Sequence, residues 1–172
     1  MADERLKETV RSYALDVEAA ADGTLYKVNG ELTVVDDTDE WKQSEWKRLK
    51  DEFLKKHPFE DPEDREIYES EDRYVTDNIG EADDIDEPEQ MSVADYVSDN
   101  SLGDIRFEVD GKMELYGGKV LLAAGGPTVW LHDDEIRGYW GGDTETWGLR
   151  SAARDALMEF FREEWETIRG SH

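Results

Sequence analysis

The stretch Lys119-Val-Leu-Leu-Ala-Ala-Gly-Gly-Pro-Thr-Val-Trp-Leu131 predicts two neighbouring strands joined by a turn. Lys119 to Ala124 is an almost continuous apolar run, which is typical of a central strand, and Thr128 to Leu131 is a second short run. Gly125-Gly126-Pro127 separates them, and turns favour glycine and proline. The stretch therefore predicts an antiparallel strand pair inside a larger sheet.

Strand patterns continue on both sides of this pair. Ile105 to Val109 alternates apolar and polar residues, and Met113 to Tyr116 follows it before Gly117-Gly118, which is expected to break or bulge the strand. Ile136 to Trp140 and Thr146 to Leu149 are two further strands after short turns. Together these runs predict an antiparallel meander.

An amphipathic helix is expected after the meander, beginning near Ser151. Its apolar stripe consists of Leu157, Phe160, Phe161, Trp165 and Ile168. Such a helix would cover one face of the sheet, so the predicted fold class is α+β.

The N-terminal region predicts a helix, a hairpin and a second helix. Apolar residues from Glu4 to Ala20 fall on one helical face, and Asn29-Gly30 between two β-rich runs is a strong hairpin signal. A second helix, over residues 40–56, carries Trp46, Leu49 and Phe53 as its apolar stripe. We therefore expect a helix–hairpin–helix lobe over 1–58, an acidic segment over 59–91, and an antiparallel sheet with a C-terminal helix over 92–169.

The segment from Glu60 to Gln90 carries fifteen carboxylates against Arg65 and Arg73, a net charge of −13, which is about half of the −25 of the whole chain. Asp61-Pro62 through Tyr74 is expected to form a short helix, and Gly80 to Gln90 an exposed loop. On a helix, carboxylates three or four residues apart are separated by about 5–6 Å. That spacing is similar to the spacing of phosphates along a nucleic-acid strand.

Five lysines lie on the predicted helix directly before this segment, between residues 41 and 57. Two interpretations stay open at this point. The lysines pair with the carboxylates inside the protein, or the carboxylates remain available to a partner.

The overall charge of −25 disfavours direct binding to nucleic acid, because phosphates would be repelled. It favours a basic partner or a salt-rich medium. The absence of cysteine fits a reducing cytosol, no apolar run reaches the length of a membrane span, and the N-terminus lacks the pattern of a signal peptide. We therefore expect a cytoplasmic protein with no membrane partner.

Catalytic and metal-binding patterns are weak. His57 and His132 are far apart and there is no cysteine, which disfavours a zinc site, and Asp83 to Glu87 lacks the glycine and closing glutamate of a calcium loop. The serines lack an elbow motif, and the Gly-Gly pairs fit turns better than phosphate-binding loops. We expect no enzyme activity, no metal and no cofactor. An enzyme would instead require an enclosed polar pocket with carboxyl groups of perturbed pKa.

Tyr139 and Trp140 are neighbours on a predicted strand, so their side chains point to opposite faces. One of them is expected to face outward, as an anchor for a protein partner or for pairing two copies of the chain. The alternative is that a helix of the N-terminal lobe covers that face.

Residues 104–168 resemble a group of small acidic proteins encoded by conjugative elements and prophages of gut bacteria. The resemblance lies in Lys119–Leu131, in Gly138-Tyr-Trp-Gly-Gly-Asp143 and in the helix ending Phe160-Phe-Arg-Glu-Glu-Trp165. Gly141 stands where the group has a second tryptophan, and Thr128 where it often has asparagine. The resemblance implies a mobile-element setting near antirestriction genes, and hence an anti-defence role that includes CRISPR inhibition. It implies no functional residues.

These observations predict an inhibitor that presents carboxylates where a basic nuclease of a bacterial defence system, a CRISPR effector or a restriction enzyme, holds nucleic acid. The expected contact residues are Glu63, Asp64, Glu66, Glu69, Glu71, Asp72, Asp77, Glu81, Asp83, Asp84 and Asp86, with Tyr139 and Trp140. The alternative is a non-enzymatic acidic scaffold or a housekeeping protein of a halophile, whose acids would be spread over the whole surface.

Overall fold

The computed structural model describes residues 4–60 and 62–170, apart from the side chain of Asp64. The chain divides into two compact units. One comprises Met1–Val34 and Gln90–His172 and is called the sheet unit below; the other comprises Val35–Glu89 and is called the acidic unit. This division differs from the three consecutive parts expected, because the first helix and the hairpin pack with the C-terminal sheet rather than with the second helix.

The sheet unit contains the expected antiparallel meander, and the α+β prediction is confirmed. Its five strands, each paired with the next in the chain, are β4 (Ile105–Val109), β5 (Leu115–Ala123), β6 (Thr128–His132), β7 (Glu135–Trp140) and β8 (Asp143–Gly148). Gly117 and Gly118 lie inside β5 and do not break it. The register shifts between Glu108 and Val109, so the expected irregularity takes the form of a bulge.

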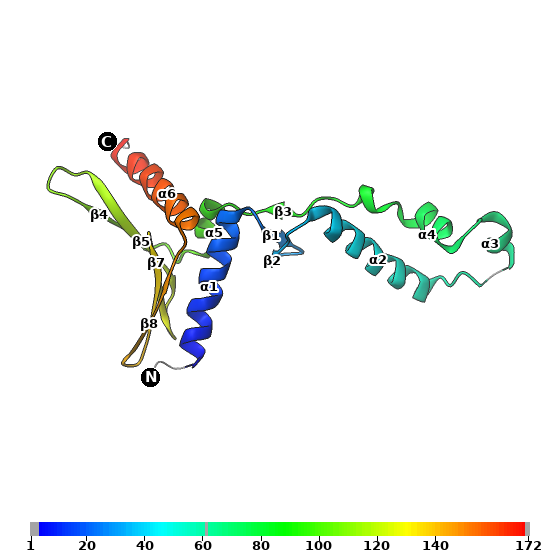
Figure 1. Cartoon of the computed structure of the whole chain (residues 1–172), viewed down its shortest axis with the longest axis horizontal. Helices are drawn as coiled ribbons and strands as arrows, with labels where there is room; N and C mark the ends of the chain where they lie inside the picture. The colour runs from blue at the N-terminus through cyan, green and yellow to red at the C-terminus, as the bar shows by residue number, and fades with distance from the viewer. Residues whose placement is uncertain (1–3, 61, 171–172) are drawn as a thin grey trace. The chain divides into compact units, whose positions relative to one another are not determined.

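Two helices pack on one face of this sheet, where a single one was expected. Figure 1 shows α1 (Glu4–Asp22) beside β7 and β8, and α6 (Ser151–Gly170) also contacts the sheet, at β5. A Cβ atom added at Gly138 would lie 2.6 Å from Val10 of α1, and one added at Gly118 would lie 2.6 Å from Phe161 of α6. Both helices therefore approach the backbone of the sheet directly at a glycine.

The core lies between these helices and the sheet. Val120, Leu131 and Ile136 are fully buried on the sheet side, and Leu157 and Phe161 on the α6 side. The prediction that Ile168 belongs to the buried stripe is wrong, since its side chain is 46% exposed. Trp165 already reaches Phe107 on β4, an edge strand, so the next turn of α6 has no strand beneath it.

The N-terminal hairpin forms as predicted. β1 (Leu25–Val28) and β2 (Glu31–Val34) pair antiparallel, and Asn29 and Gly30 have positive φ angles of 51° and 84°. The short strand β3 (Glu89–Gln90) completes a sheet of order β2-β1-β3. The helix α5 (Val93–Asn100) follows and begins with a capping box between Ser92 and Asp95.

A buried carboxylate joins α1 to the start of α6. Glu18 is only 9% exposed, and Arg150 lies against it, with its Nε 3.4 Å from Glu18 Oε2 and a backbone N–H that donates to Glu18 Oε1 at 3.3 Å. The same guanidinium donates to Asp22 at 2.7 Å. Arg150 therefore supplies the positive charge that allows Glu18 to be buried.

Replacing Arg150 with alanine should lower the free energy of unfolding, because it leaves the carboxylate of Glu18 without its cation. Urea unfolding at neutral pH measures this loss. Arg154→Ala is the matched control, since Arg154 is exposed on the first turn of the same helix and should change stability by less than about 0.5 kcal/mol. Equal losses in the two variants would contradict the role of Arg150.

The acidic unit is built from helices. They are α2 (Thr38–Lys56), α3 (Pro62–Ile67), α4 (Glu71–Ile79) and the short 3-10 helix η1 (Ala82–Asp84). Asp37 caps α2 by accepting from the backbone N–H groups of Asp39 and Glu40. The single short helix expected through Tyr74 is instead two helices, because the Ser70 hydroxyl accepts from the Arg73 N–H at 3.1 Å and starts a new one.

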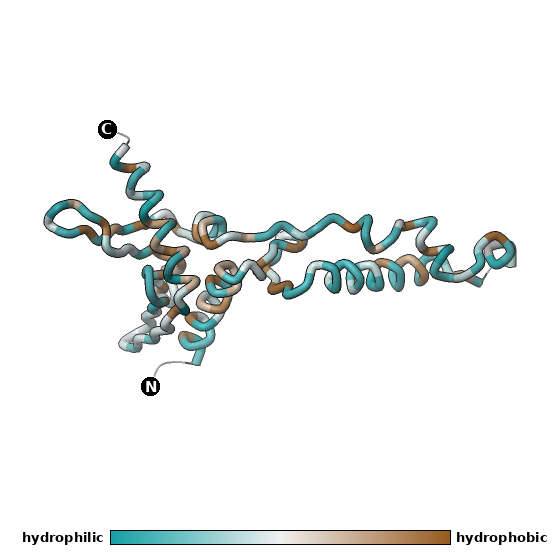
Figure 2. The backbone as a smooth tube through the Cα atoms, turned by 45° about the horizontal axis from the view of Figure 1, so that its top comes forward, coloured by the Kyte–Doolittle hydropathy of each residue, from teal (hydrophilic) through white to brown (hydrophobic). Residues whose placement is uncertain are grey.

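The hydropathy of the chain follows this division into units. In Figure 2 the backbone from α2 to η1 is mostly hydrophilic in colour, with short hydrophobic interruptions. Over the described residues, no helix is long and apolar enough to span a membrane.

Candidate partner-binding surface

The acidic segment is held on α2 by specific contacts. The indole N–H of Trp46 donates to the carbonyl of Gly80 at 2.8 Å, directly after α4. The Tyr74 hydroxyl donates to the carbonyl of His57, at the end of α2, at 3.3 Å. These bonds tie α4 to α2 at Tyr74, within the helix, and at Gly80, directly after it, so the carboxylates on α4 and η1 extend from an ordered support.

The apolar residues that interrupt the acidic run form the small core of this unit. Tyr74 is buried, and its ring centroid lies 5.5 Å from that of Phe53, 5.1 Å from Phe59 and 5.2 Å from Tyr68. Aromatic contacts of this kind contribute about 0.5–1.5 kcal/mol each beyond the area that they bury. Ile67 is the exception, because its side chain is 71% exposed.

The predicted contact carboxylates are exposed wherever the structure describes them. This set is Glu63, Glu66, Glu69, Glu71, Asp72, Asp77, Glu81, Asp83, Asp84 and Asp86. Asp64 lies in α3, but its side chain is outside the described part of the chain. The acidic unit as a whole has 22 acidic and eight basic residues, a net charge of −14 in about a third of the chain.

The lysines of α2 neutralise only part of this surface. Lys50 donates to Asp72 at 2.5 Å and lies 3.9 Å from Glu71, and these carboxylates, Asp72 first, raise the pKa of Lys50. Lys42 lies 3.7 Å from Glu87. The first interpretation drawn from the sequence therefore holds for Asp72, Glu71 and Glu87, and the availability of the other carboxylates to a partner stays a prediction.

Within α4, Arg73 lies 3.4 Å from Asp77. Six of the predicted contact residues have no ion pair among the described residues: Glu66, Glu69, Glu81, Asp83, Asp84 and Asp86. Asp84 accepts a hydrogen bond from the backbone N–H of Glu81 at 2.9 Å, so its carboxylate is engaged within the chain. The other five carboxylates are called the free acidic set below.

Tyr139 and Trp140 are both exposed, where one exposed side chain was expected. Tyr139 is 38% exposed and Trp140 is 42% exposed. The N-terminal helix α1 does cover one face of β7, as the alternative predicted. Its residues Leu6 and Val10 pack over Gly138, and Trp140 lies beyond this contact and is exposed to solvent. The structure places these two aromatic residues in the sheet unit and the carboxylates in the acidic unit.

The face of the sheet opposite α1 and α6 carries a cluster of basic side chains around Trp130 that was not predicted from the sequence. The indole ring of Trp130 has the Lys119 ammonium 4.5 Å and the Arg106 guanidinium 4.9 Å from its centroid. Arg137 stands opposite Trp130 in the β6–β7 register and bonds to Glu135. The alternation of side chains along each strand could have predicted on which face of the sheet each cation lies. Only the pairing of neighbouring strands shows that the cations lie next to one another.

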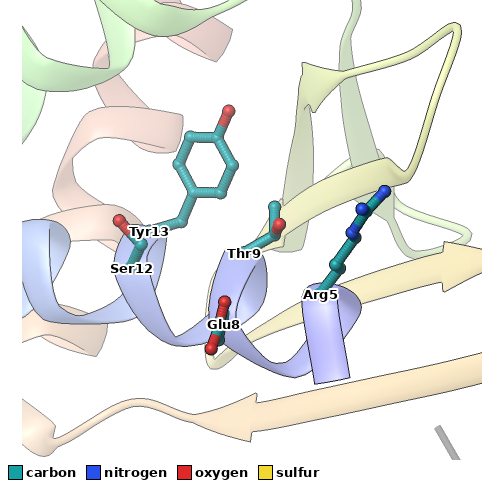
Figure 3. A pocket seen from close by; sticks show the side chains of 5 residues that line it. All are labelled: Arg5, Glu8, Thr9, Ser12 and Tyr13. Atoms are coloured by element: carbon teal, nitrogen blue, oxygen red, sulfur yellow. The ribbon is translucent and has the colours of Figure 1, made fainter. Parts of the chain in front are cut away.

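The structure holds several shallow depressions. One of about 530 Å3 lies along α1 and is lined by Arg5, Glu8, Thr9, Ser12 and Tyr13, shown in Figure 3. Its side chains all come from one helix. Among the described residues, no group of three or more His, Cys, Asp and Glu side chains could hold a metal ion.

One carboxyl group of the sheet unit has a perturbed pKa. Partial burial raises the pKa of Asp16, and the nearby hydroxyl of Tyr96 lowers it by a smaller amount. That hydroxyl is buried and has no other hydrogen-bond partner among the described residues. The Tyr96 pKa is raised in turn, chiefly by burial and then by Asp16. Asp16 belongs to α1 and Tyr96 to α5, so the pair links two core helices.

This raised pKa predicts how stability depends on pH. The folded state holds the Asp16 proton more tightly than the unfolded state. Proton binding to Asp16 therefore contributes to stability below the pKa of the unfolded state, and this stabilisation is lost as the pH rises through the pKa of the folded state. Asp16→Asn should therefore be more stable than the wild type at pH 7, and the difference should vanish below about pH 4. Urea unfolding between these pH values, with exposed Asp155→Asn as control, tests this. A difference independent of pH would contradict it.

Comparison with protein-family models, with curated proteins and with solved structures gave no match.

Proposed function

We propose that this protein is an anti-defence inhibitor from a mobile element, which occupies the nucleic-acid groove of a basic nuclease with the carboxylates of its acidic unit. The observation that supports the proposal most directly is the free acidic set, which is exposed and has no ion pairs among the described residues. Its members lie before and after α4, the helix that two hydrogen bonds hold on α2. A preorganised anionic surface speeds association with a cationic groove and lowers the entropy lost on binding.

The target class follows from the charge. A CRISPR effector or a restriction enzyme carries a positive channel for nucleic acid, and a surface with a net charge of −14 complements it. Pull-down against a panel of such nucleases, followed by plasmid protection in cells carrying the corresponding defence systems, tests the proposal. Binding that survives molar salt without weakening would contradict the electrostatic part.

The melting temperature in salt separates this proposal from a halophilic housekeeping protein. For an inhibitor we expect a modest rise that levels off by about 1 M salt, where the Debye length is about 3 Å and self-repulsion is screened. Calorimetry from low salt to saturating potassium chloride measures the curve. A melting temperature that keeps climbing through several molar salt would favour the halophilic alternative.

A further inference from the structure

The face of the five-stranded sheet opposite α1 and α6 carries no helix of the sheet unit in the part that the structure describes. The strand register places Arg106 beside Lys119, Leu121 beside Trp130, and Trp130 beside Arg137 on this face. Tyr139, which pairs with Thr128 and Thr144, extends it toward the β7–β8 turn. Tryptophan, tyrosine and arginine dominate the energetic centres of protein interfaces, so this composition fits a docking surface.

The charges on this face are mixed. Arg106 bonds to Asp104 at 3.2 Å and Arg137 bonds to Glu135, while no carboxylate of the described residues forms an ion pair with Lys119. Glu108 lies on the same face, beside Gly117. A chain of phosphates would meet these carboxylates, so the arrangement suits a protein segment better than a nucleic acid.

Lys119 and Arg106 lie over the Trp130 ring in the single chain. The complementary segment therefore needs carboxylates that draw these cations aside and an apolar side chain that takes their place on the ring. Two sheet faces related by a twofold axis could set two Trp130 rings together, but each cation would then meet only carboxylates of a face that already pairs Arg106 and Arg137 within its own chain. The α3 region has the required chemistry, because Ile67 is 71% exposed and stands between Glu66 and Glu69. Ile67 is the most exposed of the large apolar side chains among the described residues.

We propose that the open sheet face binds the α3 region of a second copy of this chain, with Ile67 on Trp130 and the flanking carboxylates toward Lys119 and Arg106. The contact joins two different surfaces, so copies associate head to tail. Two chains of net charge −25 repel each other at long range, so association strengthens as salt rises to about 0.15 M, where the Debye length is about 8 Å. The inference requires no target protein, but Glu66 and Glu69 also belong to the free acidic set, so association between copies and binding of a target would compete for these two carboxylates.

Sedimentation velocity of the full chain in about 0.15 M salt, from about 10 µM to about 1 mM protein, tests the contact. The wild type should rise above the single-chain mass of 19.8 kDa as concentration increases. Lys119→Glu and Ile67→Glu should each remain at the single-chain mass. Their mixture should form a two-chain complex and nothing larger, because it contains one intact face and one intact α3 region.

Three results would overturn the proposal. The first is a wild type that keeps the single-chain mass throughout, including the case in which α3 contacts the sheet of its own chain. The second is association that survives both substitutions, and the third is a mixture that forms no complex. Circular dichroism checks that each variant is folded. Arg106→Glu and Glu66→Lys form a second pair of variants, one in the sheet face and one in the α3 region, and the same three results would overturn the proposal with this pair.

Discussion

Neutralising the free acidic set should abolish inhibition while leaving the fold intact. The variant combines Glu66→Gln, Glu69→Gln, Glu81→Gln, Asp83→Asn and Asp86→Asn, all at exposed positions of the acidic unit. These carboxylates have no ion pair among the described residues, so their loss chiefly removes repulsion within the chain. Glu81 also takes part in the capping box of η1, and the amide oxygen that Glu81→Gln introduces can still accept that hydrogen bond. The rate of association with the target nuclease should fall at least about tenfold.

The matched control removes the same charge from the sheet unit. It combines Glu114→Gln, Glu159→Gln, Glu163→Gln, Asp134→Asn and Asp155→Asn, which are also exposed. Both variants have a net charge five units less negative than −25, so any difference between them reports the position of the charge. Association kinetics at several salt concentrations measure it, and the acidic-unit variant should also lose most of the salt dependence.

Equal losses in the two variants would mean that net charge alone drives the interaction, without a defined surface. Full inhibition of the nuclease by both variants would show that the carboxylates of the free acidic set take no part in inhibition. Only a selective loss in the acidic-unit variant supports a mimic of a polyanion.

The sequence predicted the meander, the hairpin and the long helices because local signals determine them. Asn29-Gly30 specifies a turn with two positive φ angles, and the alternation of Ile105 to Val109 specifies a strand. The break at Ser70 was missed because its serine cap competes with a helical pattern that continues on both sides.

The grouping of elements into units could not be predicted in this way. Which helix packs on which sheet depends on contacts between residues far apart in the chain, such as Glu18 with Arg150. The basic cluster around Trp130 has the same origin, since Arg106, Lys119 and Arg137 meet only through the lateral register of four strands. The candidate carboxylates were found because they are consecutive in sequence, but their pairing with Lys50 and Lys42 required the fold.

Adding a methyl group at Gly138 should destabilise the sheet unit strongly. The new Cβ would lie 2.6 Å from Val10 Cγ2 and 2.9 Å from Leu6 Cδ1, and both of those side chains are buried in the core. Overpacking of this kind costs about 1–3 kcal/mol for Gly138→Ala, and Gly138→Val should cost more, since α1 must move away from β7. Urea unfolding measures the loss.

Gly148→Ala is the control, because Gly148 also lies in a strand of the same sheet but has no atom within 4 Å of an added Cβ. That variant should be unchanged or more stable by about 0.4–1 kcal/mol, since alanine restricts the unfolded chain. Combining Gly138→Ala with Val10→Ala should give a smaller loss than the sum of the two single changes, because shortening Val10 makes room for the methyl group. Strict additivity, or a Gly138→Ala variant as stable as the wild type, would mean that α1 does not rest on β7, and the covered and open faces of the sheet would have to be reassigned.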